Sequence, residues 1–407
     1  MKDVIDSLGG KMGHTQAEKV YIIGGKRTPF GSFGGSLGHL EPSELCVFSA
    51  KAILEDLKLS PDLIDQVIVA NVIPSTPATL YSARHLALKL GMKIQTPALM
   101  MNRLCGSGME AIIQAKRLIS TGEAECVLVS GVENMSMIPH LTYGARFGTK
   151  YGGLKSRDFL LDTLTDELSM TPMGITAENL AQEYQITRAQ VDQFSLESHQ
   201  KAVKARDFLR KEIAPVEVKG KLIQDDEHVR TDAKIEEISK LKPTFKKDGV
   251  VTAASASGIV DGAASVLIAS HAFIKRHKLQ PLCAIEASKV VGVEPTKMGI
   301  GPVPAIEGLL RDANKDIKSI DLFEINEAFA PQVLSCQKAL EIPSEKLNIW
   351  GGAIAIGHPL GASGVRLALT LGRQLQNLGL KSGIVSACIG GGQGIAILIS
   401  REGECLS

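Results

Sequence analysis

The sequence has no apolar run long enough to cross a bilayer as a helix. It also has little net charge, because 45 basic and 44 acidic side chains leave only +1, which gives no bulk attraction to nucleic acid or to a membrane surface. Its seven cysteines are an odd number scattered from Cys46 to Cys405, so they do not form a disulfide framework. We therefore expect a soluble globular protein of a reducing compartment, without nucleic-acid or membrane partners.

The two ends carry no recognisable targeting signal. The first 18 residues are polar and contain Gly9-Gly10 but no arginine, a pattern typical of neither a secretory signal nor a transit peptide. We expect residues 1–18 to form a flexible extension. The final residues, 404–407, do not form a peroxisomal address. The predicted location is cytoplasmic.

Three glycine-rich turns carry chemically reactive side chains. Cys105 lies in the turn 102–108, His358 in the Gly-His-Pro turn 357–361, and Cys388 heads the turn 388–394. Two thiols and one imidazole can supply a covalent nucleophile, its base and a second proton-transfer group. Taken alone, His358 could be a loop imidazole and Cys388 a packed strand end, but the three together indicate an active site.

The context of Cys105 favours a reactive thiol over a buried structural one. It follows the apolar run 98–101 and precedes a helical pattern of apolar residues from Met109 to Ile119. This places the sulfur at a helix N-terminus, where peptide dipoles favour an anion. A thiol pKa near 8.5 can fall there to roughly 3.5–7.5.

An internal repeat relates the two halves of the chain. Ile64 and Ile320 precede similar apolar runs, Gly108 and Gly364 open helical patterns, and residues 130 and 386 are serines that end strands. Each pair is 256 residues apart. We therefore expect two halves of similar α/β fold, each alternating strands with amphipathic helices. At this offset His358 corresponds to Asn102.

The segment between the repeats is richer in charge and loops. Its basic residues are interpreted as solvated helix faces. The predicted organisation is a first core half with the nucleophile, a loop domain, and a second core half with Asn326, His358 and Cys388. The predicted bounds are 19–136 with 259–284 for the first half, 137–258 for the loop domain and 285–407 for the second half.

Six motifs in order resemble the thiolases, and most closely the degradative 3-ketoacyl-CoA thiolases, also called acetyl-CoA acyltransferases. The resemblance runs from about Val20 to about Ile399. It implies an α/β fold of duplicated α/β/α layers, with a mixed five-stranded sheet in each half and an inserted loop domain over the active site. The motifs are the Cys105 turn, Glu133-Asn134-Met135-Ser136, residues 253–258, Asn326-Glu327-Ala328-Phe329, residues 351–359 and the Cys388 turn.

The resemblance implies an acyltransferase that splits 3-ketoacyl-CoA with CoA into acetyl-CoA and a shortened acyl-CoA, reversibly. Cys105 would be the acylated nucleophile, His358 its base, and Cys388 the acid and base at the α-carbon. Asn326 would hold a water that forms one oxyanion site with His358. The backbone N–H groups of Cys105 and Gly390 would form the other.

The resemblance also implies the substrate contacts. Ser257 would contact the pantetheine of CoA and Arg230 its adenine nucleotide, and Leu164, Met173 and Phe329 would line the acyl and pantetheine tunnel. Core packing is an equal alternative for Leu164 and Met173. CoA is expected as a substrate, with no permanently bound cofactor and no metal. Residues 133–155 resemble the family's tetramerisation region, which predicts a homo-oligomer built as a dimer of dimers.

Other functions account for less of the sequence. The covering loop reads Pro172-Met173-Gly174, without the His that acetoacetyl-specific thiolases commonly carry. This favours the degradative enzymes over the alternative, a biosynthetic acetyl-CoA acetyltransferase. An NAD-dependent oxidoreductase would explain the G-x-G-x-x-A pattern at 106–111, but the next strand, 126–129, ends in Ser130-Gly131 without the acidic residue that would bind the ribose. A non-catalytic acyl-CoA or lipid carrier would not need three reactive residues, and condensing synthases generally have His or Asn at the position of Cys388.

Overall fold

A ten-stranded mixed sheet forms the centre of the computed structural model, which describes residues 18–401. Nine strands follow the order β14-β15-β16-β13-β1-β12-β5-β3-β4, and β2 pairs with β12. All eleven residues of β12 are buried, as expected for a strand covered on both faces. The strands are β1 (Val20–Arg27), β2 (Gly31–Ser32), β3 (Gln66–Ala70), β4 (Ala98–Met101), β5 (Cys126–Asn134), β12 (Val260–Ser270), β13 (Cys283–Gly292), β14 (Leu322–Ile325), β15 (Ser382–Ile389) and β16 (Gln393–Ser400).

The sheet repeats one pattern of strand pairing, which confirms the duplicated α/β fold. In the first half β3 pairs in parallel with β4 and β5, and β12 and β1 follow in antiparallel order. In the second half β14 pairs in parallel with β15, and β16 and β13 follow in antiparallel order. Five strands were expected here, but the described residues form four, with a single parallel bridge from Phe323 to Leu347 in the outer position. Two residue pairs between β1 and β13 join the halves into one sheet.

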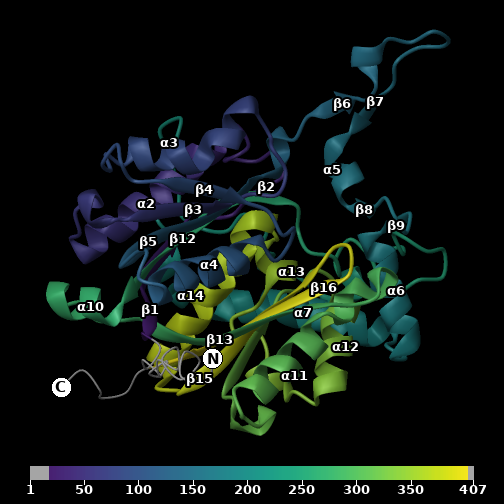
Figure 1. Cartoon of the computed structure of the whole chain (residues 1–407). Coiled ribbons are helices and arrows are strands. Elements are labelled where there is room, and N and C mark those ends of the chain that lie inside the picture. Colours follow the sequence, from purple (N-terminus) through teal and green to yellow (C-terminus); the bar gives the residue numbers. More distant parts are fainter. Residues whose placement is uncertain (1–17, 402–407) are drawn as a thin grey trace, which may run out of the picture.

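The helices form three layers around the two half-sheets (Figure 1). Helices α2 and α3 cover the outer face of the first half, and α11 covers the outer face of the second, with α12 beside it. Helices α4 and α14 pack against each other between the half-sheets, where the largest apolar core lies. The bounds are α2 (Pro42–Leu57), α3 (Ser82–Lys89), α4 (Ser107–Ser120), α10 (His271–His277), α11 (Pro302–Asp312), α12 (Ala330–Leu340), α13 (Ala353–Ile356) and α14 (Leu360–Leu378).

A repeated aspartate makes the duplication visible at the level of single hydrogen bonds. Asp65 Oδ2 accepts from the backbone N–H groups of residues 125 and 126, at 2.7 and 3.0 Å. Asp321 Oδ2 accepts from those of residues 381 and 382, at 2.8 and 3.0 Å. All three pairs of positions are separated by the same 256 residues (321 − 65, 381 − 125 and 382 − 126). The carboxylate satisfies N–H groups at the start of a central strand in each half.

Two glycines let the central helices approach closely. A Cβ added to Gly364 on α14 would lie 2.4 Å from the backbone nitrogen of Met109, and one on Gly108 would lie 2.8 Å from the carbonyl oxygen of Gly361. Neither obstacle is the end of a flexible side chain, so a larger residue would separate α4 from α14. These helices directly follow Cys105 and His358, and their separation therefore controls how the two turns meet.

The segment 137–258 contributes no strand to the main sheet. Its strands form three separate two-stranded sheets, and β6, β7 and α5 project from the body of the molecule (Figure 1). The predicted domain boundaries remain predictions. Over residues 18–401 no helix is long and apolar enough to cross a membrane. The elements are β6 (His140–Thr142), β7 (Ser156–Asp158), α5 (Phe159–Thr163), β8 (Thr165–Asp166), β9 (Thr171–Pro172), α6 (Met173–Glu183), α7 (Arg188–Lys204), α8 (Arg206–Glu212), β10 (Val216–Val218), β11 (Lys221–Ile223) and α9 (Ile235–Ile238).

Candidate active site

The predicted catalytic residues lie at one edge of the two half-sheets. Cys105 lies between β4 and α4, and Asn326 directly follows β14. Cys388 is the second-to-last residue of β15. Gly390 lies in the turn from β15 to β16, and His358 lies between α13 and α14. Parallel strands present their carboxyl ends at the same edge of a sheet, which is where α/β folds place their ligands. Residues far apart in sequence are thereby brought together.

The turn around Cys105 is held by hydrogen bonds of the Ser107 and Arg103 side chains. Leu104, directly before Cys105, has φ 47°, an uncommon left-handed conformation for a residue with a side chain. Ser107 Oγ accepts from the backbone N–H of Arg103 at 2.7 Å and donates to the Leu104 carbonyl at 2.6 Å. Arg103 Nη1 donates to Gln393 Oε1 at 2.9 Å, which ties this turn to the turn that follows Cys388.

The Cys105 thiol is protonated in the free protein. Burial raises its pKa to about 11, although the backbone N–H groups of Gly390 and of Cys105 itself donate to the sulfur and oppose that rise. The nearby Glu133 carboxylate adds to the rise. Burial therefore opposes the lowering of this pKa that is expected from the helix N-terminus.

His358 is a buried, neutral imidazole. Its Nε2 lies 3.3 Å from Asn326 Nδ2, and its Nδ1 lies 2.5 Å from Ser363 Oγ. Burial lowers its pKa to about 3, and the positive charge of Arg366 contributes to the lowering. A neutral imidazole has one unprotonated nitrogen. This nitrogen can accept a proton, as a base for Cys105 must do.

Cys388 is fully buried beside the nucleophile. Burial raises the pKa of its thiol well above the ordinary value, and the proximity of Cys105 raises it further. The thiol is therefore a proton donor in the free protein. Two residues predicted to line the substrate tunnel pack against the same apolar cluster, whose members are Met298, Ala328 and Cys388 with Met173 and Phe329.

A second apolar cluster adjoins Cys105 and includes Leu164. The backbone N–H of Met173 donates to the Leu164 carbonyl at 3.0 Å, so these two predicted lining residues are neighbours. The ring of Phe245 meets that of Phe329 edge to face, 6.0 Å between centroids. The cluster contains Val72, Ile73, Met135, Ile138, Leu160 and Leu360, with Leu104, Cys105, Phe159 and Leu164 packed against it.

Of the predicted CoA contacts, Ser257 lies beside the Cys388 cluster and Arg230 lines a cavity. Ser257 is half-buried, and its backbone N–H donates to the Ala328 carbonyl at 3.0 Å. Arg230 is exposed at a cavity of about 420 Å³ whose wall also includes Ala253 and Ala254, a few residues before Ser257. His199 and His228 line the same cavity, and the backbone N–H of Arg230 donates to the His199 ring at 3.2 Å.

No role for Glu133 was predicted, although it begins the motif Glu133-Asn134-Met135-Ser136. It is fully buried, and its carboxylate accepts hydrogen bonds from the backbone N–H groups of Val72, Ile73 and Gly361 and from the Asn71 amide, at 2.8 to 3.1 Å. It therefore fastens the turn after His358 to the first half. An acid near the end of a mostly apolar strand was the available signal. Ser363 and Phe245 were also missed: nothing in the sequence marks the contact of Ser363 with His358, and Phe245 meets Phe329 from a segment distant in sequence.

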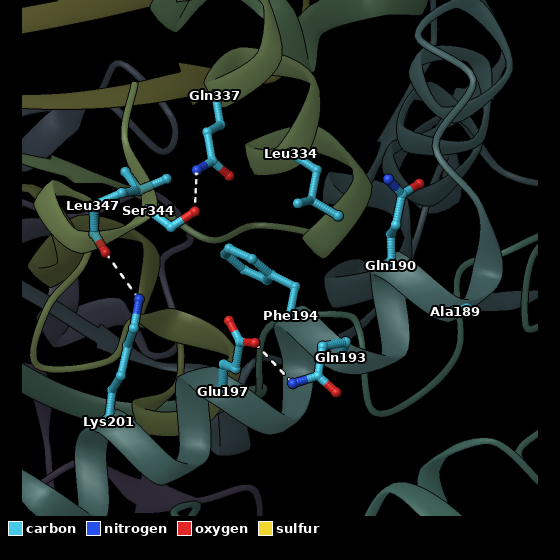
Figure 2. Close-up of a pocket in the computed structure, with 10 residues that line it drawn as sticks. All are labelled: Ala189, Gln190, Gln193, Phe194, Glu197, Lys201, Leu334, Gln337, Ser344 and Leu347. Atoms are coloured by element: carbon cyan, nitrogen blue, oxygen red, sulfur yellow. Dashed lines mark hydrogen bonds between the residues drawn. The ribbon is translucent and has the colours of Figure 1, made fainter. Parts of the chain in front are cut away.

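A different hollow lies between α7 and α12 (Figure 2). Its volume is about 380 Å³, and Phe194 and Leu334 form its apolar part. Its polar groups bond among themselves or to backbone: Gln193 to Glu197 at 2.8 Å and Lys201 to the Leu347 carbonyl at 3.0 Å. It contains no predicted site residue.

Comparison with known proteins identifies the family of the chain. Family models described as the thiolase N-terminal and C-terminal domains match residues 20–272 and 279–401, and the chain belongs to the thiolase family. It is 48% identical over 389 residues to the mitochondrial 3-ketoacyl-CoA thiolase of Mus musculus, covering 94% of this chain and 98% of that protein. It is 43% identical to a probable acetyl-CoA acyltransferase of Staphylococcus aureus (strain COL), covering 94% and 99%. The crystal structure of human mitochondrial 3-ketoacyl-CoA thiolase in complex with CoA is similar, with a TM-score of 0.93 at 46% identity, covering 95% and 98%.

Proposed function

We propose that this protein is an acetyl-CoA acyltransferase, a thiolase that cleaves 3-ketoacyl-CoA with CoA into acetyl-CoA and a shortened acyl-CoA. The proposal rests on the proximity of Cys388 to Cys105, together with the contact of His358 with Asn326 and the Gly390 N–H directed at the Cys105 sulfur. Membership of the thiolase family and the similarity to named 3-ketoacyl-CoA thiolases support the same reaction.

The first half of the reaction acylates Cys105. Nε2 of His358 takes the thiol proton as the sulfur attacks the 3-keto carbon. Because the thiol pKa is about 11 and that of the imidazole about 3, this transfer accompanies the attack rather than preceding it. The bond between the α and β carbons then breaks, and its electron pair becomes the enolate of acetyl-CoA. A covalent intermediate replaces one difficult step with two easier ones.

Cys388 completes the cleavage. Its thiol donates a proton to the α-carbon of the enolate, and acetyl-CoA leaves. The thiol of free CoA then gives its proton to the Cys388 thiolate and attacks the acyl carbon. The Cys105 sulfur departs and recovers its proton from His358. In the opposite direction the same groups carry out a Claisen condensation.

Negative charge on oxygen needs preorganised donors about 2.7–3.1 Å away. The Gly390 and Cys105 N–H groups, which contact the sulfur in the free protein, would serve the oxygen on the carbon under attack. The protonated Nε2 of His358, with a water held by Asn326, would serve the enolate oxygen. Each pair combines groups from different turns.

The CoA substrate would extend from this edge past Ser257 to the cavity at Arg230. The guanidinium of Arg230 is exposed there and suits a phosphate. Met173 and Phe329, packed beside Cys388, would contact the pantetheine, and the apolar cluster that includes Leu164 would receive the acyl chain. That cluster supports substrates longer than acetoacetyl-CoA. No permanently bound cofactor is needed for this chemistry.

Steady-state thiolysis of 3-ketoacyl-CoA substrates from C4 upwards tests the substrate class. We expect turnover across several lengths. Activity confined to C4 would instead indicate the biosynthetic acetyl-CoA acetyltransferase, which uses the same chemistry on a narrower substrate, and no activity at any length would overturn the proposal.

Mass spectrometry after addition of substrate without CoA tests the covalent step. We expect an acyl adduct on Cys105. An adduct on another cysteine, with Cys105 unmodified, would refute the assignment. His358→Ala should slow alkylation of Cys105 by iodoacetamide and reduce turnover by about 10²–10⁴-fold.

A homo-oligomer, a dimer of dimers, is part of the proposal. Strand β4 lies at the edge of the main sheet, and its Leu99 is exposed, as are Tyr81 and Ile94 nearby. The projecting segment carries the exposed rings of Phe147 and Tyr151. Exposed edges and apolar patches are typical of contact surfaces. Light scattering at micromolar concentration should report four chains, and a monomer would overturn this part.

A cytoplasmic location is also proposed. The six cysteines within residues 18–401 are free thiols, which suits a reducing compartment. The mouse relative is named as mitochondrial, so fractionation of cells that express the full chain should compare both compartments. Recovery with the mitochondrial fraction would contradict the proposed location.

A further inference from the structure

Ser363 lies between His358 and a backbone carbonyl. It is in the first turn of α14, and its Oγ is 2.5 Å from His358 Nδ1 and 3.1 Å from the Pro359 carbonyl oxygen. Both side chains are buried, with 1% of Ser363 and 5% of His358 exposed. The hydrogen-bond partners of the imidazole are therefore fixed by protein groups.

The contacts favour one arrangement of the protons. With Asn326 oriented so that its amide nitrogen faces Nε2 at 3.3 Å, the amide N–H donates and Nε2 presents a lone pair. In a neutral imidazole the proton is then on Nδ1, which donates to Ser363 Oγ. The hydroxyl proton of Ser363 is directed to the Pro359 carbonyl, which completes the chain.

We propose that Ser363 is a positioning residue that holds His358 in the Nδ1–H tautomer and so leaves Nε2 free to take the Cys105 proton. The inference depends on the proposed role of His358 as the base. Serine proteases use an aspartate to fix the tautomer of their histidine. The partner in this protein is uncharged, so it orients the ring without adding a negative charge that would stabilise the imidazolium.

The chain offers a matched control. Ser335 on α12 is also fully buried, and its Oγ donates to the carbonyl of Pro331, four residues earlier, at 2.8 Å. Ser335→Ala removes the same kind of helical hydrogen bond as Ser363→Ala. Within residues 18–401 Ser335 makes no hydrogen bond to a histidine, so the comparison of the two variants isolates the effect of the imidazole.

The experiment measures kcat and KM for thiolysis and the rate of Cys105 alkylation by iodoacetamide. Ser363→Ala should lower kcat by about 10- to 100-fold, less than the roughly 10²–10⁴-fold that a positioned base supplies, since the base is still present. The KM for CoA should change by less than about twofold, and alkylation should slow with kcat. Ser335→Ala should keep both rates within about twofold of the unmodified protein.

A second pair of variants keeps the test valid if Ser363→Ala does not fold. Thr and Val have the same shape and differ by the hydroxyl, so Ser363→Thr should retain most activity and Ser363→Val should lose it. Equal activity of Thr and Val, or of Ser363→Ala and Ser335→Ala, would overturn the inference. If Cys105 alkylation and turnover were normal in His358→Ala, the proposed base would be wrong. If they were impaired in His358→Ala but normal in Ser363→Ala, only the positioning role of Ser363 would be refuted.

Discussion

Substitution of Gly364 by alanine tests whether the contact between the central helices holds the site together. Alanine is ordinarily the better residue inside a helix, by about 1 kcal/mol over glycine. At this position, however, the new Cβ would lie 2.4 Å from the backbone nitrogen of Met109 on α4. Relief requires the two helices to separate, because no flexible side chain can move aside.

The expected magnitude follows from these opposing effects. Overpacking of a well-packed core costs about 1–3 kcal/mol, and more where backbone must move. Because backbone must move here, we take about 2–3 kcal/mol for the overpacking; after subtraction of the helix gain of about 1 kcal/mol, the expected net destabilisation is about 1–2 kcal/mol. At about 2.1 cal/mol/K per residue, this lowers the Tm of a chain of 407 residues by roughly 1–3 °C.

Gly308→Ala is the matched control. Gly308 is a buried glycine inside α11, but its nearest obstacle is the flexible end of Lys289, 3.2 Å from the added Cβ. This variant should be neutral or slightly more stable than the unmodified protein. Differential scanning calorimetry and thiolysis should be measured on both variants. Equal Tm values for the two, with unchanged kcat in Gly364→Ala, would refute the reasoning that this crossing is tight and positions the catalytic turns.

Three further predictions concern single groups of the site. Cys388→Ser should still acquire an acyl label on Cys105 but lose exchange of the acetyl-CoA methyl protons with deuterated water; exchange at the unmodified rate would make Cys388 a packed strand-end thiol. Because burial raises the pKa of Cys105 to about 11, its alkylation rate should keep rising with pH beyond 9, since the thiolate fraction grows about tenfold per pH unit below the pKa; a plateau near pH 7 would show a stable thiolate. Glu133→Gln should lower stability by about 1–3 kcal/mol in urea unfolding, because the amide turns its own N–H groups toward backbone donors; an unchanged midpoint would contradict this.

The fold was largely predictable because its signals are local or periodic. Apolar strands and helical patterns follow one another in each half, and the constant offset of 256 residues reported the duplication before any contact was known. The joining of the halves was not predictable in the same way. It depends on two residue pairs between β1 and β13, whose partners lie more than 260 residues apart.

The positions of Cys105, His358 and Cys388 next to helix starts and a strand end were also predictable, because glycine-rich segments mark them in the sequence. Their protonation states were not. A helix N-terminus is visible in the sequence and favours a thiolate, but the burial that opposes it comes from segments distant in the chain. Ile389, for example, packs against the glycine that follows Cys105. Desolvation is a property of the assembled site, and no spacing of residues reports it.

The duplication also explains how one scaffold came to hold unlike chemical groups. Ser107 and Ser363 are 256 residues apart and occupy the first turns of α4 and α14. In the first half the hydroxyl bonds within its own turn, to Arg103 N–H and the Leu104 carbonyl, and it shapes the loop that presents the nucleophile. In the second half the equivalent hydroxyl meets the imidazole of His358. The same helix start thus adjoins the proposed nucleophile in one half and its proposed base in the other, and the tight packing of α4 on α14 controls how the two turns meet.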